Sequence, residues 1–459
     1  MNSSHDPLYG KRVVVIGFAR QGKALARWLP TIGANVVVSD SKTAEELNLN
    51  PEDYPGVEFV LGSQRVATLK KADLVLVSGG VPLTLPIIKG AIRRGIPLAN
   101  DAQLFLERCP APVLGITGSA GKTTTTSLTG SILNAASYKT WVGGNIGEVL
   151  LDVLPNIHPS DFVAMELSSF QLELMTVSPD FACITNITPN HLDRHGTMEA
   201  YTRTKANIFL HQNEPEQVVI LNRDDAISHE LAGEVRAQLA WFSLYEMIPD
   251  GAFLAGNRFI LSGLCSSDRK PHVVGNRSEV KLRGEHNLAN VLAACAITSA
   301  AGVKSDVLFE AVRAFRGVPH RLEIVRALDG ITYVNDSIAT APERVAAALR
   351  SFDEPLILLL GGRDKKLPWG EMLALALEKT RQIIVFGEIG SLVMKTARKL
   401  KADPASISQV ATLDDALVKA ISVARPGDIV LLSPGGTSYD AYVDFAARGE
   451  HFRALVNAL

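Results

Sequence analysis

The sequence has few cysteines, four among 459 residues, and few aromatic residues, at 6%. The cysteines are scattered without a Cys-x-x-Cys pair, which argues against a disulfide framework or a zinc site. No apolar run reaches the roughly 18 residues of a membrane span, and residues 1–6 lack the charged and apolar regions of a signal peptide. We therefore expect a cytoplasmic protein that does not insert into membranes.

Neither sign of charge is in excess, because 46 Lys and Arg residues stand against 48 Asp and Glu residues, for a formal net charge of -2. This near balance argues against a generally basic protein that binds nucleic acid. Hydrophobic residues make up 47% and charged residues 20% of the chain, which is typical of a folded protein with a core. At about 150 residues per domain, the length predicts about three domains.

Short apolar runs that alternate with helical stretches predict an α/β protein. We expect a Rossmann-like domain over residues 1–100, a central domain with a P-loop ATPase-type parallel sheet over 101–317, and a second Rossmann-like domain over 318–459. Short, turn-rich segments at 251–282 predict a small β excursion in the central domain. Strands are expected at 13–17, 35–40, 72–78, 112–117, 162–166, 181–185, 331–334, 356–360, 382–386 and 428–432.

The strongest motif is Thr117-Gly118-Ser119-Ala120-Gly121-Lys122-Thr123-Thr124, between a predicted strand and a predicted helix. Its glycines let backbone N–H groups converge on phosphate oxygens, and the helix N-terminus adds positive potential. Lys122 would contact the β- and γ-phosphates, and the Thr123 hydroxyl would reach Mg²⁺. Ile116 stands where the strict Walker pattern has glycine, so only the shorter form is present. We expect phosphate binding, with a glycine turn and helix cap as the structural alternative.

A second glycine loop, at 17–22, occupies the dinucleotide position of the first predicted domain, and Asp40 closes the second strand. The middle glycine, which lets the backbone approach a pyrophosphate, is replaced by Ala19. This replacement argues against a nicotinamide cofactor. Another nucleotide or diphosphate, or a purely structural turn, remains open.

Four polar residues of the central domain are candidates for the same site. Glu166 ends an apolar strand, where a carboxylate suits Mg²⁺ ligation, and His191 lies in a loop where a hydrogen-bonded structural histidine is the alternative. Lys205 by itself would be a solvated helix lysine. Asn287 precedes an Ala-rich stretch and is a natural N-cap for a helix there.

Together these residues resemble the Mur ligase family over essentially the whole chain. The stretch Glu-Leu-Ser-Ser-Phe-Gln-Leu-Glu at 166–173 resembles the glutamate-adding member in particular. The resemblance rests on eight ordered blocks: Thr117-Gly118-x-x-Gly121-Lys122-Thr123-Thr124, Gly143-Gly144-Asn145-Ile146-Gly147, residues 166–173, residues 186–194, His286-Asn287, Pro319-His320-Arg321, Asn335-Asp336-Ser337 and Leu432-Ser433-Pro434.

The resemblance implies an ATP-dependent ligase of peptidoglycan precursor synthesis, with Mg²⁺ as its metal. The reaction would add D-glutamate to UDP-N-acetylmuramoyl-L-alanine through an acyl phosphate, giving ADP and phosphate. The N-terminal domain would hold the uridine diphosphate, the central domain ATP and the C-terminal domain the amino acid. We expect a monomer whose partners are these substrates.

The resemblance also assigns roles to individual residues. Lys122 would neutralise the γ-phosphate, Thr123 and Glu166 would hold a first Mg²⁺, and His191 a second. Lys205 matches a lysine that the family carbamylates, and the resulting anion would help to organise the metal. The residues that would bind ATP are Gly118, Ser119, Ala120, Gly121, Thr124, Asn287, Arg321 and Asp336. Those that would bind the sugar nucleotide are Gln21, Asp40, Asn145, Ser168 and Gln171. Those that would bind glutamate are Thr340, Lys365, Ser438 and Phe445.

Three departures from the family pattern concern the amino acid. Ile338 stands where many members carry lysine, Asn190 where aspartate is frequent, and Gly435-Gly436-Thr437-Ser438 differs from the commonest sequence. A related ligase that adds L-glutamate to the same nucleotide has a similar isoleucine-containing stretch and is the near alternative. Less favoured are a folylpolyglutamate-type synthase, which lacks a domain like residues 1–100, a dehydrogenase, and a non-enzymatic protein that binds a nucleotide.

Overall fold

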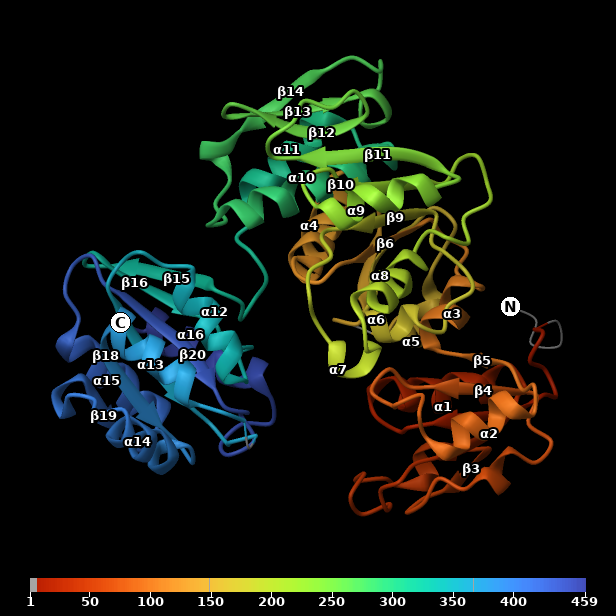
Figure 1. The fold of residues 1–459 in the computed structure, drawn as a ribbon, viewed down its shortest axis with the longest axis horizontal. Helices are drawn as coiled ribbons and strands as arrows, with labels where there is room; N and C mark the ends of the chain where they lie inside the picture. The colour runs from red at the N-terminus through yellow and green to blue at the C-terminus, as the bar shows by residue number, and fades with distance from the viewer. Residues whose placement is uncertain (1–5, 148, 366) are drawn as a thin grey trace. The chain divides into compact units, whose positions relative to one another are not determined.

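The computed structural model describes residues 6–147, 149–365 and 367–459. The N-terminal stretch considered above therefore lies, up to residue 5, outside the described residues. Three sheets of five, nine and six strands, each accompanied by helices, confirm the α/β class with three domains (Figure 1). Among the described residues, no helix is both long and apolar enough to cross a bilayer. By its internal contacts the chain forms two compact units, one of Met1–Lys281 with Glu285–Phe315 and one of Leu282–Gly284 with Arg316–Leu459.

The first sheet is parallel, with strand order β3-β2-β1-β4-β5. Alternate residues of β1 enter two different cores: Val13 and Val15 pack with the side chains of α1, and Val14 and Ile16 with those of α2. Because both faces are buried, the strand reads as an uninterrupted apolar run. The elements are β1 (Arg12–Ile16), α1 (Arg20–Thr31), β2 (Asn35–Ser39), β3 (Val57–Val60), β4 (Leu74–Val77), α2 (Pro86–Arg93) and β5 (Leu98–Ala99).

The central sheet has the order β14-β13-β12-β11-β10-β9-β6-β8-β7 and is parallel from β7 to β12. The predicted excursion consists of β12, β13 and β14, whose antiparallel pairs extend the main sheet at one edge. Strands β7, β10 and β11 lie outside the predicted strands. The strands are β6 (Val113–Thr117), β7 (Thr140–Gly144), β8 (Phe162–Glu166), β9 (Phe181–Ile184), β10 (Val218–Asn222), β11 (Gln238–Ser243), β12 (Gly251–Ala255), β13 (Arg258–Ser262) and β14 (His272–Asn276).

The neighbouring strands β6 and β8 are parallel, and Ile116 pairs with Glu166. The carboxyl ends of both strands therefore meet at the same edge of the sheet, where parallel α/β sheets bind their ligands. The helices of this part of the chain are α3 (Asp101–Leu106), α4 (Lys122–Ala135), α5 (Leu150–Val153), α6 (Ser169–Leu172), α7 (Leu192–His195), α8 (Met198–Ala206), α9 (Ala226–Glu230), α10 (Glu285–Ala300) and α11 (Ser305–Ala314).

The third sheet has the order β15-β16-β20-β17-β18-β19, and only β15 is antiparallel to its neighbour among these strands. The edge strands β15 and β19 lie outside the predicted strands because they are partly exposed and lack a continuous apolar run. The elements are β15 (Glu323–Leu328), β16 (Ile331–Asn335), α12 (Pro342–Arg350), β17 (Leu356–Gly361), α13 (Gly370–Lys379), β18 (Thr380–Phe386), α14 (Gly390–Lys399), β19 (Ile407–Gln409), α15 (Leu413–Val423), β20 (Ile429–Gly435) and α16 (Phe445–Asn457).

Candidate active site

The phosphate loop joins the end of β6 to the start of α4, the context that the motif requires. Gly118 has a φ of +155° and Gly121 a φ of +84°, conformations that residues with side chains rarely adopt. A Cβ on Gly118 would lie 1.8 Å from Thr185 Oγ1, and a Cβ on Gly121 would lie 2.1 Å from Asn290 Oδ1. Both positions therefore require glycine. The loop leads into the N-terminus of α4, which favours an anion.

Asn186 and Lys122 hold the loop in shape. The Asn186 side chain accepts a hydrogen bond from the Ala120 N–H at 2.9 Å and donates one to the Ala120 carbonyl at 3.1 Å. The Lys122 ammonium donates to the carbonyls of Gly118 at 2.7 Å and Ser119 at 3.2 Å. The positive charge of Lys122 thus stays at the loop that would hold a phosphate.

Glu166 lies at the end of β8 with 1% of its surface exposed. Its Oε2 accepts a hydrogen bond from Thr123 Oγ1 at 2.8 Å, and its Oε1 accepts one from Asn145 Nδ2 at 2.7 Å. The structure therefore brings together Thr123 and Glu166, the two residues that the resemblance assigns to one ion. The amide of Asn145, which the resemblance assigns to the sugar nucleotide, bonds this carboxylate and orients it.

The oxygen atoms of Thr123 and Glu166 fit a magnesium ion. Mg²⁺ prefers oxygen ligands, keeps several waters and takes others from substrate phosphates. Within the described ranges, no group of three His, Cys, Asp or Glu side chains could hold a metal by itself. A site with one hydroxyl and one carboxylate beside a phosphate loop suits an ion that obtains its remaining ligands from water and nucleotide.

Lys205 lies in α8 and is 1% exposed, so its interpretation as a solvated helix lysine is wrong. Its ammonium donates to the Gly118 carbonyl at 2.8 Å and to Thr117 Oγ1 at 3.4 Å. Burial lowers the pKa of Lys205 well below its ordinary value; the charge of Lys122 lowers it further, and Glu166 opposes the shift. A buried amine with a lowered pKa is neutral more often and therefore more nucleophilic.

His191 immediately precedes α7 and has a φ of +52°, in the left-handed region. Its ring centroid lies 4.9 Å from that of Phe170. Burial lowers the pKa of His191, as do the charges of Lys122, Lys205 and Arg194, while Asp193 raises it. The neutral ring that results is the form that can ligate a metal.

In the first sheet, the residues assigned to the sugar nucleotide shape the glycine loop. Asp40 accepts hydrogen bonds from the N–H groups of Phe18 at 2.7 Å and Lys42 at 2.9 Å. Gln21 Oε1 accepts one from the Gly79 N–H at 3.3 Å. The carboxylate of Asp40 therefore holds the loop conformation.

Ser168 and Gln171 form a capping box at the start of α6. Gln171 Oε1 accepts hydrogen bonds from the Ser168 N–H at 3.1 Å and from Ser168 Oγ at 2.9 Å. Gln171 is fully buried. Asn100 Nδ2 donates to the Gln171 carbonyl at 2.7 Å, which ties the start of α3 to this turn.

Asn287 is the third residue of α10, so its interpretation as an N-cap is wrong. Its Oδ1 accepts a hydrogen bond from Asn290 Nδ2 at 3.1 Å. Because Asn290 also packs against Gly121, Asn287 connects to the phosphate loop through one side chain.

Arg321 and Asp336 belong to the second compact unit. Asp336 is 4% exposed, and its carboxylate accepts hydrogen bonds from Ser433 Oγ at 2.8 Å and the Leu322 N–H at 3.2 Å. Burial raises the pKa of Asp336 to about 7, although these bonds and the charges of Arg321 and Arg344 oppose the shift. This carboxyl is therefore partly protonated near neutral pH.

The residues assigned to glutamate lie at the carboxyl edge of the third sheet. Lys365 Nζ donates to Thr340 Oγ1 at 3.0 Å, so the structure brings these two together. Burial lowers the pKa of Lys365, as do the charges of Arg344 and Arg448. Ser438 is 2% exposed and follows β20, and Phe445 begins α16 with 36% of its surface exposed.

Arg448 is a buried cation beneath this edge that the sequence interpretation does not identify. Its guanidinium donates to the Ser337 carbonyl at 2.9 Å, to Ser337 Oγ at 3.0 Å and to the Gly436 carbonyl at 3.2 Å. Burial lowers its pKa to about 10. An arginine near the start of a helix gives no sequence signal of burial, so only packing reveals it.

Comparison with protein families finds three matches along the chain: the MurD-like N-terminal domain of Mur ligases at residues 11–100, the Mur ligase middle domain at 116–298, and the Mur ligase glutamate ligase domain at 320–436. The UDP-N-acetylmuramoylalanine--D-glutamate ligase of Pelotomaculum thermopropionicum is 39% identical over 98% of both chains. That of Symbiobacterium thermophilum is 40% identical over 98% of both chains. The chain belongs to the Mur ligase family.

Solved structures agree with this Mur ligase fold. The UDP-N-acetylmuramate-alanine ligase from Thermotoga maritima matches with a TM-score of 0.56 at 19% identity, covering 97% of this chain and 99% of its own. At this identity the likeness concerns the fold alone.

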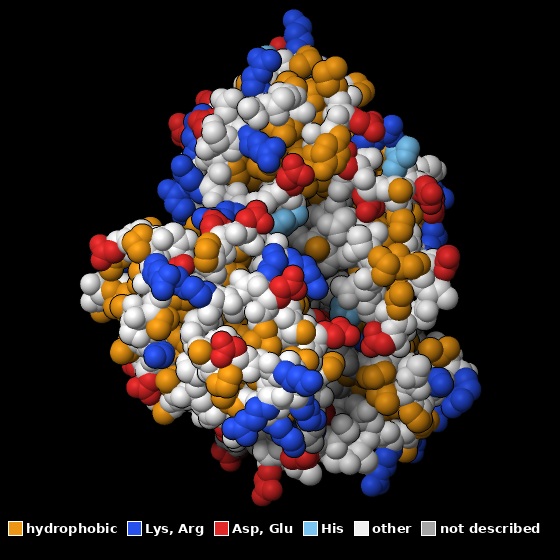
Figure 2. Space-filling model, turned by 60° about the vertical axis from the view of Figure 1, so that its left-hand side comes forward, with side chains coloured by type: hydrophobic (Ala, Val, Ile, Leu, Met, Phe, Trp, Pro, Cys, Tyr) orange, Lys and Arg blue, Asp and Glu red, His pale blue; other side chains and the backbone are white. Residues whose placement is uncertain are grey.

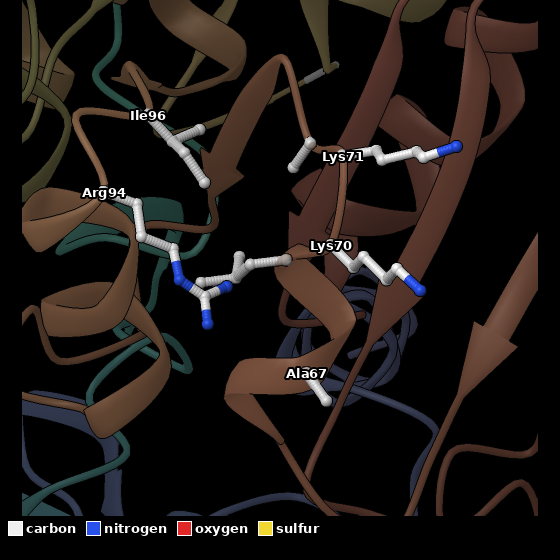
Figure 3. A pocket seen from close by; sticks show the side chains of 7 residues that line it. Ala67, Lys70, Lys71, Arg94 and Ile96 are labelled. Carbon is white, nitrogen blue, oxygen red and sulfur yellow. The ribbon is translucent and has the colours of Figure 1, made fainter.

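Charged side chains of both signs occur among apolar ones on the visible face of this Mur ligase (Figure 2). A cavity of about 510 Å³ in the first domain is lined by Lys70, Lys71 and Arg94 together with apolar residues. The amines of Lys70 and Lys71 extend away from Arg94 (Figure 3), and the Arg94 guanidinium donates to the Val66 carbonyl at 3.2 Å. Because these charges do not converge and no assigned residue lines it, this cavity is not the candidate active site.

Proposed function

We propose that this Mur ligase joins D-glutamate to UDP-N-acetylmuramoyl-L-alanine, using ATP and Mg²⁺, in peptidoglycan precursor synthesis and hence in cell-wall formation. ATP converts the lactoyl-alanine carboxylate to an acyl phosphate, the amine of glutamate attacks it, and phosphate leaves. The observation that carries the proposal is the 39–40% identity over 98% of the chain to ligases of this name. The cluster of Lys122, Thr123, Glu166 and Lys205 at one phosphate loop supports it.

Each domain would have its own ligand. Residues 1–100 would bind the uridine diphosphate, residues 101–317 ATP, and residues 318–459 the amino acid. The glycine loop at 17–22 supports the first assignment, because Ala19 argues against a dinucleotide. We further propose that the protein works as a monomer in the cytoplasm, where these precursors are made.

In the central domain, the chain's own residues would bind and orient the triphosphate. Lys122 would neutralise the γ-phosphate, and the amides at the start of α4 would contact phosphate oxygens. Thr123 and Glu166 would hold one Mg²⁺, and His191 a second. When bound, the metal offsets the charge that develops during phosphoryl transfer. Lys205, once carbamylated, would place an anion beside Gly118.

On the nucleotide and sugar-nucleotide sides, several residues would complete the site. Asn287, Arg321 and Asp336 would clamp ATP. The residues that would contact the sugar nucleotide are Gln21, Asp40, Asn145, Ser168 and Gln171.

For the amino acid, Lys365 would pair with the side-chain carboxylate in a charge-assisted contact, next to Thr340, Ser438 and Phe445. L-glutamate is the alternative substrate, because the related ligase for the L-enantiomer has a stretch similar to the one around Ile338. The D-enantiomer is favoured by the names of the relatives.

The test is an assay of ADP release with ATP, Mg²⁺, UDP-N-acetylmuramoyl-L-alanine and either enantiomer of glutamate, with the product checked by mass. We expect release and amide formation with D-glutamate only. Release with L-glutamate only would replace this proposal by the alternative, and no release with either would overturn the ligase assignment. A Lys122→Ala variant is the control, since it should keep the fold and lose turnover.

A further inference from the structure

Arg194, in α7, makes three different contacts with its guanidinium. Nη1 donates to the Gly79 carbonyl at 3.0 Å, and Nε and Nη2 donate to Glu173 Oε2 at 3.3 and 3.0 Å. The guanidinium carbon also lies 4.1 Å from the centre of the Phe170 ring. Only 17% of the side chain is exposed, so this is a fixed contact and not a mobile surface ion pair.

Gly79 follows β4 in the first sheet, and its backbone N–H and its carbonyl are both hydrogen-bonded to side chains. Its N–H donates to Gln21 Oε1 at 3.3 Å, and its carbonyl accepts from Arg194. A Cβ on Gly79 would lie 3.5 Å from Gln21 Oε1 and 3.9 Å from Phe170 Cβ. Arg194 thus reaches the glycine loop of the first domain through one residue.

On its other side, Arg194 is connected to His191. The Arg194 N–H donates to the His191 carbonyl at 3.1 Å, and the Phe170 ring touches both the Arg194 guanidinium and the His191 ring. His191 has a left-handed backbone, a conformation that costs free energy unless its surroundings hold it. The stacked Arg194 and Phe170 side chains supply such a hold.

We propose that Arg194 is a positioning residue that keeps Gln21, on the sugar-nucleotide side, and His191, on the metal side, in one arrangement. The inference rests on the proposed function, because that function gives Gln21 and His191 their ligands. A lysine cannot replace this arginine, because its single ammonium cannot stack on Phe170 and bond Gly79 and Glu173 in one plane.

Arg313, in α11, is a control outside the proposed site, although its side chain is more exposed, at 46%. Its Nε donates to Glu279 Oε1 at 2.6 Å, and its guanidinium carbon lies 5.3 Å from the centre of the Phe309 ring. It therefore shares with Arg194 an ion pair and an aromatic contact. Neither Glu279 nor Phe309 is assigned to a ligand.

The experiment compares Arg194→Lys, Arg313→Lys and the unmodified protein. We expect Arg194→Lys to raise the KM for UDP-N-acetylmuramoyl-L-alanine about tenfold, which corresponds to about 1.4 kcal/mol, and to lower kcat. The KM for ATP should stay within about twofold, and the midpoint of thermal unfolding should match that of Arg313→Lys. Calorimetric binding of UDP-N-acetylmuramoyl-L-alanine without ATP should weaken by a similar factor.

A double-mutant cycle with Gln21→Ala tests the connection through Gly79. If Arg194 and Gln21 act as a unit, the double variant will lose less free energy of sugar-nucleotide binding than the sum of the losses in the two single variants. Additive effects, or an Arg194→Lys variant equal to the unmodified protein, would overturn the inference. Failure of the unmodified protein to bind the sugar nucleotide would instead overturn the proposed function.

Discussion

The Thr123 hydroxyl donates a hydrogen bond to Glu166 Oε2 at 2.8 Å, and so joins the first turn of α4 to the end of β8. The second oxygen of the carboxylate is held by the Asn145 amide. A metal bound here would meet oxygen atoms already fixed in place, which lowers the entropy lost on binding.

We predict that Thr123→Val raises the Mg²⁺ concentration for half-maximal ADP release about tenfold, because valine has the same shape but offers no oxygen. Thr123→Ser keeps the hydroxyl and should remain within about twofold of the unmodified protein. The measurement is a Mg²⁺ titration at saturating ATP. Equal behaviour of the two variants would show that the hydroxyl does not ligate the metal.

Lys205 provides a second prediction, because its buried amine is suited to react with carbon dioxide. Lys205→Ala should lose most activity and regain part of it with added acetate or formate, since a small carboxylate can occupy the place of the carbamate. Lys304→Ala, which removes an exposed lysine, is the control and should neither lose activity nor respond. Activity of Lys205→Ala that no carboxylate restores would argue against carbamylation.

A third prediction concerns Lys365, which bonds Thr340 at the edge of the third sheet. Lys365→Met should raise the KM for glutamate tenfold or more, roughly the loss expected when a charge-assisted hydrogen bond disappears. The KM for the sugar nucleotide should not change. The measurement is steady-state kinetics, with Lys395→Met on α14 for comparison. An unchanged KM for glutamate in Lys365→Met would show that the amino acid binds elsewhere.

Asp101, the first residue of α3, provides a prediction about pH. It is 6% exposed, and burial raises its pKa to about 6, although hydrogen bonds and the charge of Arg20 oppose the shift. The folded state therefore binds the proton more tightly than the unfolded state does. The ionised carboxyl destabilises the fold fully above the folded pKa, and this penalty fades as pH falls towards the unfolded value of 3.8.

Asp101→Asn should accordingly stabilise the protein by about 3 kcal/mol at pH 7.5, at roughly 1.4 kcal/mol per pKa unit, and by about half as much at pH 5. Urea unfolding of both proteins at the two pH values measures the difference. Asp306→Asn, at an exposed position in the first turn of α11, should show no such gain. A gain that grows towards pH 5 would reverse the sign and refute the assignment.

The sequence predicts the strands that carry the phosphate loop and Glu166, because β6 and β8 are buried on both faces and read as apolar runs. It also predicts that the loop residues and Glu166 meet at one edge of the sheet, because glycine, lysine, threonine and glutamate stand at strand ends. It does not predict the burial of Lys205. That burial depends on the packing of α8 against Thr117, and Lys205 and Thr117 are 88 positions apart in the sequence.

Two more features show the limit of local patterns. Asparagine favours an N-cap, yet α10 already begins at Glu285, and Asn287 instead bonds Asn290 within the helix. Arg194 lies in a block that identifies the family, but its contact with Gly79 joins segments 115 residues apart. Local propensity cannot report such pairs, because they form only when the sheets are assembled.

The pairing of Ile116 with Glu166 also limits where residues can be inserted or deleted without loss of the site. Deleting one codon within β8 would shift every later side chain by one position and turn the Glu166 carboxylate to the opposite face of the sheet. Length variation among relatives should therefore avoid this strand and gather in outlying segments such as the turns between β12, β13 and β14, where an added residue displaces nothing near the phosphate loop.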